Sequence, residues 1–125
     1  MIVGIGTDIV AIHRIRAALE RPRTGARFRD RVFTPDEVAY CERRRTCWES
    51  FAARFAAKEA FFKAFGEAAA WQEVAVVRDS GPPRFALSGR TALRAAERGI
   101  ARVHLSISHD GDFASAFVVA DDASG

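Results

Sequence analysis

Cysteine, long apolar runs and leader-like segments are all scarce in this sequence, and each shortage excludes a class of protein. The two cysteines, Cys41 and Cys47, are too few for a disulfide framework and form no zinc-binding pattern, so we predict two free thiols. No apolar run approaches the roughly 18 residues that a membrane span requires. The opening segment MIVGIGTDIV has neither the basic region nor the cleavage site of a signal peptide. We therefore predict a cytoplasmic protein that does not enter a membrane.

Internal repeats and low-complexity tracts are also missing. The 125 residues are 49% hydrophobic and 28% charged, which is the balance of a folded protein with one core. We therefore predict a single domain over residues 1–125.

Lysine is nearly absent, because 17 of the 19 basic residues are arginine. Both lysines, Lys58 and Lys63, lie in the six-residue window KEAFFK. A lysine ammonium is a compact charge whose pKa shifts readily, whereas arginine is a planar and permanently charged fork. The retention of lysine in this window alone indicates a functional segment.

The net charge of +3 is unevenly distributed. One short stretch near the N-terminus holds seven arginines and only two acids; the arginines are Arg14, Arg16, Arg21, Arg23, Arg27, Arg29 and Arg31. A basic patch suits a nucleic acid, an anionic membrane or an acidic protein. No nucleic-acid-binding motif accompanies it.

Hydrophobic periodicity and capping signals predict an α+β fold, with a small, mainly antiparallel sheet packed against one long central helix and short flanking helices. Thr34, Pro35 and Glu37 form a capping box with proline at the first helical position. Gly66 predicts the end of the long helix, and Asp110-Gly111 predicts a hairpin. The expected strands are 2–10, 71–78, 84–87, 103–108 and 113–120; the expected helices are 11–20, 35–44, 49–65 and 91–98, and 21–33 is expected to be a loop.

The long helix is apolar on most sides, so its polar residues are unusual. Phenylalanines form one stripe, and Ala52, Ala56, Ala60 and Ala64 form another that permits close backbone approach. The polar exceptions are Arg54, Lys58, Glu59 and Lys63.

Two carboxylates from separate elements are candidate metal ligands. Asp8 ends a buried strand, and Glu59 lies on the apolar helix. Asp8 alone also suits a turn cap, and Glu59 with Lys63 four residues later also suits an ordinary helical ion pair. Together the two acids suit Mg²⁺, or Mn²⁺, which takes one or two carboxylates, waters and substrate phosphates. Lys63 and Arg54 would then supply positive charge for phosphates.

His109 closes a strand at the hairpin, in the segment Ser106-Ile107-Ser108-His109. A single histidine at such a position is commonly an ordinary surface or core residue, and no nucleophilic triad is apparent around it. The alternative is that His109 donates a hydrogen bond to a phosphate.

Taken together, these motifs resemble the small, single-domain phosphopantetheinyl transferases of the holo-acyl-carrier-protein synthase type. The matching segments follow the family's order along nearly the whole chain: GIGTDIV at 4–10, FTPDEVAYC at 33–41, RFAAKEAFFKAFG at 54–66, SGPP at 80–83 and HLSISHD at 104–110. The long-helix motif, with GTDIV upstream and SISHD downstream, makes the resemblance specific.

The resemblance implies a role for each matched position. Asp8 and Glu59 match the metal ligands, and Lys63 matches the lysine near the pyrophosphate. We predict that Glu59 and Lys63 are the catalytic residues, with Glu59 accepting the serine proton directly or through a metal-bound water. The coenzyme A site is matched by Arg54, Lys63, Gly66, Pro83 and His109. In two places the sequence departs from the family: a Gly-Lys-Pro turn reads Gly81-Pro82-Pro83, and a Gly-Thr-Gly loop after the long helix is replaced by a shorter segment, GEAAA at 66–70.

The implied reaction is Mg²⁺-dependent transfer of 4′-phosphopantetheine from coenzyme A to a serine of an apo acyl carrier protein, which releases adenosine 3′,5′-bisphosphate. The acceptor would serve fatty-acid or polyketide synthesis. Because carrier proteins are acidic, we expect them to dock on Arg14, Arg16, Arg21 and Arg23. The family also implies a homotrimer with active sites between subunits. The rival interpretations are a metal-dependent hydrolase of coenzyme A or nucleotides, and a basic nucleic-acid-binding domain.

Overall fold

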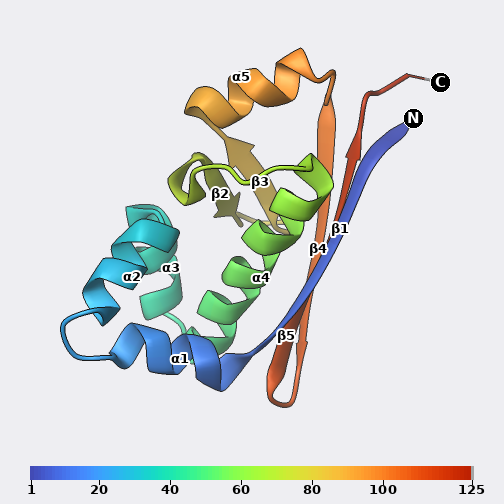
Figure 1. Ribbon diagram of the computed structural model, residues 1–125. Coiled ribbons are helices and arrows are strands. Elements are labelled where there is room, and N and C mark those ends of the chain that lie inside the picture. The colour runs from blue at the N-terminus through green and yellow to red at the C-terminus, as the bar shows by residue number, and fades with distance from the viewer. Residues whose placement is uncertain (125) are drawn as a thin grey trace.

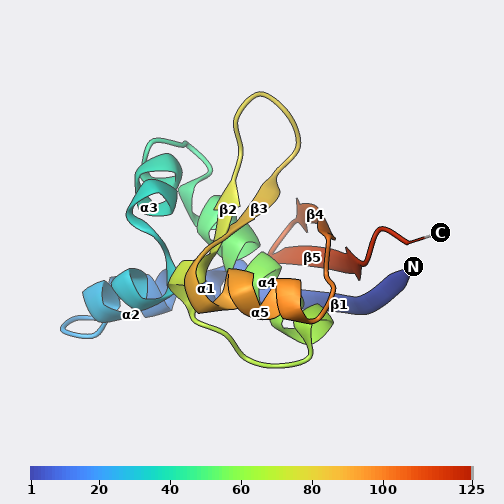
Figure 2. The same ribbon diagram turned by 90° about the horizontal axis from the view of Figure 1, so that it is seen from above.

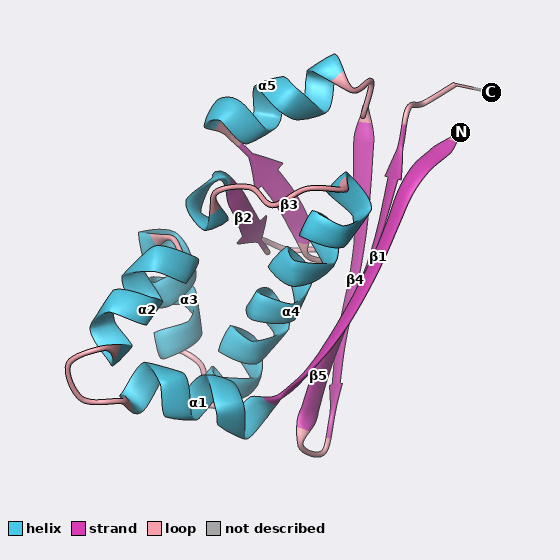
Figure 3. Cartoon of the chain, viewed as in Figure 1, coloured by secondary structure: helices cyan, strands magenta, loops and turns pink. Residues whose placement is uncertain are grey.

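The computed structural model describes residues 1–124 and has the α+β architecture that the sequence predicts (Figure 1). A three-stranded antiparallel sheet in the order β1-β5-β4 packs one face against the long helix α4. Figure 3 shows the remaining helices and a two-stranded hairpin, β2-β3, gathered on the α4 side of the sheet. The elements in chain order are β1 Ile2–Ala11, α1 Ile12–Glu20, α2 Gly25–Val32, α3 Pro35–Glu42, α4 Cys47–Phe65, η1 Trp71–Glu73, β2 Val74–Val77, β3 Arg84–Leu87, α5 Gly89–Glu97, β4 Arg102–Asp110 and β5 Phe113–Asp121.

The helix α4 lies unusually close to strand β1. The alanine stripe, predicted to permit close backbone approach, is buried, and Ala52, Ala56 and Ala60 are fully inaccessible to solvent. A Cβ atom added at Gly4 or Gly6 would come within 1.9 Å of the Ala64 or Ala60 carbonyl oxygen. Both glycines are therefore required by the backbone approach, because no side chain fits between this strand and the helix.

Several local signals in the sequence are confirmed. The Thr34 hydroxyl accepts a hydrogen bond from the Glu37 N–H, and the Glu37 carboxylate accepts one from the Thr34 N–H, so the capping box is complete. Gly66 ends α4 with φ = 86°, in the left-handed region that favours glycine. Gly111 and Asp112 form the two-residue turn between β4 and β5.

Two expectations from the sequence are wrong. The segment 21–33 is not a continuous loop, because Gly25–Val32 forms helix α2. The strand expected over 71–78 is shorter, since Trp71–Glu73 is a 3₁₀ turn and only Val74–Val77 pairs with β3. Trp71 lies flat against Phe55, with ring centroids 5.4 Å apart. We attribute the turn to this packing, which local propensity does not contain.

A buried ion pair joins α3 to α4. Lys58 has no exposed surface, and its Nζ donates hydrogen bonds to Glu37 Oε1 at 2.6 Å and to the Val32 carbonyl at 2.6 Å. Glu37 Oε2 accepts a further hydrogen bond from the Val76 N–H at 2.8 Å. Burial lowers the pKa of Lys58, and the Glu37 charge opposes that shift. Lys58 is therefore a structural residue, and only Lys63 of the two lysines is available for chemistry.

The outer face of the sheet is apolar. Alternate residues of β1 and β5 place Ile5, Ile9, Phe113 and Phe117 on this face, and all four are exposed. Figures 1 and 2 show that, within residues 1–124, no helix covers it. None of the helices described is long and apolar enough to cross a membrane.

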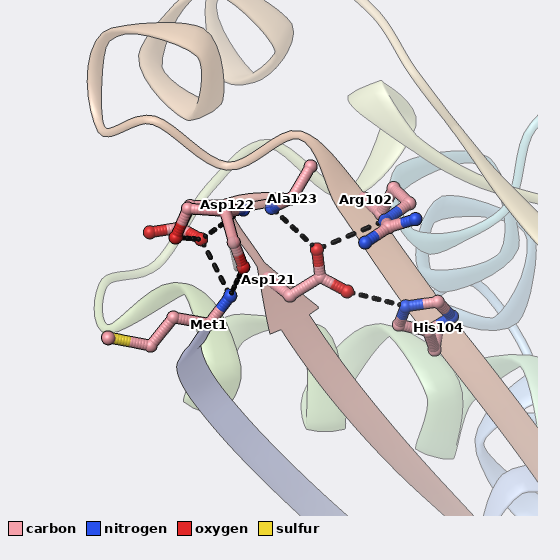
Figure 4. Close-up of polar contacts among 7 residues, drawn as sticks. Met1, Arg102, His104, Asp121, Asp122 and Ala123 are labelled. Carbon is pink, nitrogen blue, oxygen red and sulfur yellow. Dashed lines mark hydrogen bonds and ion pairs between the residues drawn. The ribbon is translucent and has the colours of Figure 1, made fainter.

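A polar network ties the two chain ends together at one end of the three-stranded sheet (Figure 4). The Met1 ammonium donates to Asp122 Oδ1 at 2.8 Å and to the Ser124 carbonyl. Asp121 lies 2.7 Å from His104 Nε2 and accepts a hydrogen bond from Arg102 Nε at 3.1 Å. The hydrogen bonds from His104 and from the Ala123 N–H lower the pKa of Asp121 to about 2.

Replacing Lys58 with methionine should destabilise the protein strongly, because the carboxylate of Glu37 would remain buried without its cation. The expected loss is about 3–5 kcal/mol in the free energy of unfolding, measured by urea denaturation. Arg84→Gln is the matched control, since it removes the exposed Arg84–Asp79 pair at 3.4 Å. That change should cost less than about 1 kcal/mol. Similar losses for the two variants would contradict the structural role of Lys58.

Candidate functional site

Strand β1 places Asp8 against the C-terminal half of α4. Asp8 lies on the same face of the strand as Gly4 and Gly6, and its side chain is 18% exposed. Lys63 Nζ donates to the Thr7 carbonyl at 2.8 Å and lies 3.4 Å from Asp8 Oδ1. The lysine is thus fixed to β1 by two contacts and stays half-exposed.

Glu59 is the second acid of this cluster. It lies on α4, one turn before Lys63, and is only partly exposed. The ordinary Glu59–Lys63 ion pair is not formed: within residues 1–124, Glu59 makes no salt bridge, and Lys63 pairs with Asp8 instead. Burial, followed by the negative charge of Asp8, raises the pKa of the Glu59 carboxyl, and Lys63 opposes the shift. Glu59 is therefore an acid whose charge lacks a full partner.

The chemistry of these two acids fits a hard divalent cation. Their oxygen atoms are the donors that Mg²⁺ and Mn²⁺ prefer. Residues 1–124 assemble no group of three or more histidine, cysteine, aspartate or glutamate residues that could hold a metal ion. Two carboxylates beside an open cleft match Mg²⁺, which keeps several waters and takes substrate phosphates as ligands.

An open cleft of about 910 Å³ adjoins the cluster. Glu59, Lys63 and Gly66 line it, so the structure brings three of the predicted residues to one cavity next to Asp8. Its other lining residues are Arg31, Phe62, Glu67, Ala68, Ala69, Ala70, Trp71 and Gln72. The segment 67–70 forms one wall, and Glu67 is held by Arg94 at 3.1 Å.

Sequence reasoning did not identify Arg31 as a residue of this cleft. It belongs to helix α2, which was expected to be a loop, and it was counted only as one charge of the basic patch. A helical reading of 25–32 would have indicated that Arg31 and Phe28 lie on one side, three residues apart.

Arg54 and His109 do not reach this cleft. Arg54 and Lys63 are nine residues apart on α4, which is about two and a half turns, so their side chains leave opposite sides of the helix. Arg54 and His109 instead line a second hollow of about 320 Å³. This hollow, the anion hollow, is bounded by Tyr40, Arg44, Thr46, Glu49, Ser50, Ala53, Arg54, Arg78, Ile107, Ser108 and His109.

Arg54 is the most unusual residue of the anion hollow. Arg54 is only 3% exposed, and its buried Nε has no hydrogen-bond partner within residues 1–124. A buried, permanently charged group without such a partner is costly. An arginine in this state is suited to an anionic ligand that supplies the missing acceptors.

The remaining predicted residues lie away from both cavities. Pro83 is part of the connection between β2 and β3, which projects from the body in Figure 2, and it lines neither cavity. Arg14 and Arg16 lie on α1, and Arg21 and Arg23 follow it; all four are exposed. Arg16 is held by Glu20 at 3.2 Å and lies over the Trp48 ring.

The comparisons with known proteins agree with one another. Residues 4–118 match the family described as the 4′-phosphopantetheinyl transferase superfamily. The chain is 50% identical over 124 residues to a holo-[acyl-carrier-protein] synthase of Desulforudis audaxviator, with 96% of this chain and 93% of the relative covered. The solved holo-[acyl-carrier-protein] synthase of Neisseria meningitidis superposes with a TM-score of 0.86 at 37% identity, covering 97% of this chain and 99% of that one.

A second solved structure contains a ligand. The Helicobacter pylori holo-[acyl-carrier-protein] synthase in complex with coenzyme A superposes with a TM-score of 0.80 at 30% identity, covering 94% of this chain and 99% of that one. The fold, the sequence matches and the acid–lysine cluster all point in one direction, and the chain belongs to the 4′-phosphopantetheinyl transferase superfamily, in the group of the holo-[acyl-carrier-protein] synthases.

Proposed function

We propose that this protein transfers the 4′-phosphopantetheine group of coenzyme A to a serine of an apo acyl carrier protein, in a reaction that depends on Mg²⁺. The observation that carries the proposal is the cluster of Asp8, Glu59 and Lys63 beside the open cleft, where one carboxylate lacks a full cationic partner. Carrier proteins of fatty-acid and of polyketide synthesis are both candidate acceptors.

Asp8 and Glu59 would hold the cation, with Mn²⁺ as a substitute for Mg²⁺. When bound, the cation neutralises the charge that develops on the pyrophosphate and orients it. Lys63, anchored to Thr7 and Asp8, adds a fixed positive charge beside the leaving phosphate. Gly66 lets the chain turn closely around the same cleft.

The reaction exchanges a phosphoanhydride bond of coenzyme A for a phosphate ester bond to serine. The serine oxygen of the carrier protein forms a bond to the β-phosphorus of coenzyme A, and the bond from that phosphorus to the bridging oxygen breaks. The serine proton passes to Glu59, and adenosine 3′,5′-bisphosphate leaves. Most of the rate acceleration would come from positioning and from charge neutralisation, as in other phosphoryl transfers.

The basic surface around α1 is the proposed docking site for the carrier protein. Arg14, Arg16, Arg21 and Arg23 are exposed there, close in sequence to the helix α2 that supplies Arg31 to the cleft. An acidic carrier protein would be attracted to this surface and held with its serine near Glu59.

The family resemblance, together with the two separated cavities, leads us to propose a homotrimer with active sites between subunits. Coenzyme A carries a pyrophosphate and a separate 3′-phosphate. Lys63 and Arg54 leave opposite sides of α4. One molecule of coenzyme A would therefore reach the cleft at Lys63 and the anion hollow at Arg54 only when the cleft belongs to one copy and the hollow to its neighbour. The exposed apolar face of β1 and β5 is the proposed contact between copies. The anion hollow would then receive the 3′-phosphate.

Glu59→Gln should lower kcat by about 10²-fold or more, because the change keeps the shape of the side chain and removes the metal-binding, proton-accepting charge. The measurement is intact-mass analysis of apo carrier protein incubated with coenzyme A and Mg²⁺. A product formed from coenzyme A without modification of the carrier protein would instead support a hydrolase. Near-normal turnover of the variant would refute the mechanism.

The same variant has a stability signature that separates metal binding from folding. Since burial and Asp8 raise the pKa of Glu59, the folded metal-free protein binds this proton more tightly than the unfolded chain does. At neutral pH the ionised Glu59 therefore opposes folding. The protonated Glu59 stabilises the folded protein at low pH, and this contribution to the free energy of unfolding is lost as the pH rises through the raised pKa. In excess chelator, the Tm of Glu59→Gln should equal or exceed that of the unmodified protein. Added Mg²⁺ should raise the Tm of the unmodified protein and leave that of Glu59→Gln unchanged.

Reversing two charges of the docking surface, by Arg14→Glu together with Arg21→Glu, should raise the KM for carrier protein and leave the KM for coenzyme A nearly unchanged. The effect should shrink at high salt, because exposed charges are screened over about 8–10 Å. Arg84→Glu, on the β2-β3 hairpin, is a matched reversal outside the patch. Equal losses for both substrates, or an equal effect of the control, would show that the carrier protein docks elsewhere.

Sites shared between copies should allow two impaired variants to rescue each other. Glu59→Gln lacks the acid of one cavity, and Arg54→Gln lacks the arginine of the other. An intact site in a mixed trimer takes its cleft from an Arg54→Gln copy and its anion hollow from a neighbouring Glu59→Gln copy. In an equal co-expressed mixture each of these choices is made half of the time, so roughly a quarter of the sites should be intact. Transfer at low coenzyme A should then exceed the mean of the two parent proteins. An activity equal to that mean would place both residues in one subunit's site.

A further inference from the structure

The Tyr40 ring contacts two of the arginines in the anion hollow. The guanidinium carbon of Arg54 lies 4.1 Å from the ring centroid, and that of Arg44 lies 5.1 Å from it. All three residues line the hollow together with Arg78 and His109. Tyr40 lies on α3, Arg44 follows that helix, and Arg54 lies on α4, so the ring connects two separate elements.

The ring holds Arg54 without using its hydrogen-bond donors. Within residues 1–124, the Arg54 side chain makes no hydrogen bond and no salt bridge, although Glu49 also lines the hollow. A guanidinium over an aromatic face is attracted by the ring quadrupole and keeps its in-plane N–H groups free. A carboxylate in the same place would neutralise the arginine and occupy those donors. The tyrosine therefore keeps Arg54 both ordered and available to an anion.

The position of the ring is fixed by the buried core of the molecule. Tyr40 follows Glu37 by three residues on α3, and Glu37 is fixed by the capping box and by Lys58. The Tyr40 side chain also packs against the main hydrophobic core. Its orientation is consequently set by packing, so the ring can act as a rigid support for the two arginine side chains.

We propose that Tyr40 is a positioning residue that presents Arg54 and Arg44 to the 3′-phosphate of coenzyme A and so sets the preference for coenzyme A over dephospho-coenzyme A. This inference rests on the proposed function, in which the anion hollow receives that phosphate. Tyr40 touches neither the reacting phosphorus nor the serine. Its loss therefore changes how tightly the donor is bound rather than how fast the bound donor reacts.

The test compares the two donors in three proteins: unmodified, Tyr40→Leu and Tyr40→Phe. Dephospho-coenzyme A lacks only the 3′-phosphate, and the reaction then releases adenosine monophosphate. Tyr40→Leu should raise the KM for coenzyme A about 10-fold, the scale of two lost cation–π contacts, and leave kcat within about twofold. Its KM for dephospho-coenzyme A should change little. Tyr40→Phe, which keeps the ring, should retain the donor preference of the unmodified protein.

The ratio of kcat/KM for the two donors protects the test against partial unfolding, because inactive protein lowers both values equally. Tyr40→Met, which fills the packing space without a ring, replaces Tyr40→Leu if the latter does not yield soluble protein. An equal rise in KM for both donors, or an unchanged preference without the ring, would overturn the role of Tyr40. Failure of the proposed function is distinct: the unmodified protein would not modify the carrier protein, or would not prefer coenzyme A.

Discussion

The close contact between α4 and β1 is the constraint on which the candidate site depends. At Gly4 and Gly6, the carbonyl oxygens of α4 occupy the space that a Cβ would need. Asp8 follows on the same face of β1, and at this separation it reaches Lys63, which in turn bonds to the β1 backbone at Thr7. A larger residue at either glycine must move the strand away from the helix, because a packed core has no free space to absorb it. The glycines thus serve the chemistry indirectly, by setting the distance between two charged side chains.

Local signals allowed much of this arrangement to be predicted from the sequence. The capping box at Thr34, the left-handed Gly66 and the turn at Gly111 depend on residues that are neighbours in the chain, and all three are confirmed. Helix α2 was missed because its stability is not local. It begins at Gly25, where a Cβ would meet the Leu19 carbonyl, and its Thr24 cap makes no side-chain hydrogen bond. Contacts with α1 and with the Trp71 turn, rather than helix propensity, hold these residues in place.

The two lysines show where sequence reasoning ends. They are five residues apart on one helix, and the argument from composition applied equally to both. Lys58 points toward Glu37, which comes 21 residues earlier in the chain, and is fully buried. Lys63 points toward β1 and the open cleft. No local pattern distinguishes them, since the difference depends on which element packs on each side of α4. The prediction that Asp8 and Glu59 share one site combined an energetic argument with the family resemblance.

The long helix also explains why the charged residues fall into two groups. α4 is rigid and buried on most sides, so a polar side chain on it emerges only where the surrounding elements leave an opening. Glu59 and Lys63 emerge beside β1, whereas Arg54 emerges on the opposite side, between α3 and β4. One copy of the chain therefore carries two separate cationic side chains, each with its own support: β1 anchors the lysine, and the Tyr40 ring anchors the arginine. In the proposed function, a substrate with two distant phosphate groups would fit this division when two copies lie side by side, and the apolar face of the sheet that the described helices leave exposed would be the surface on which they meet.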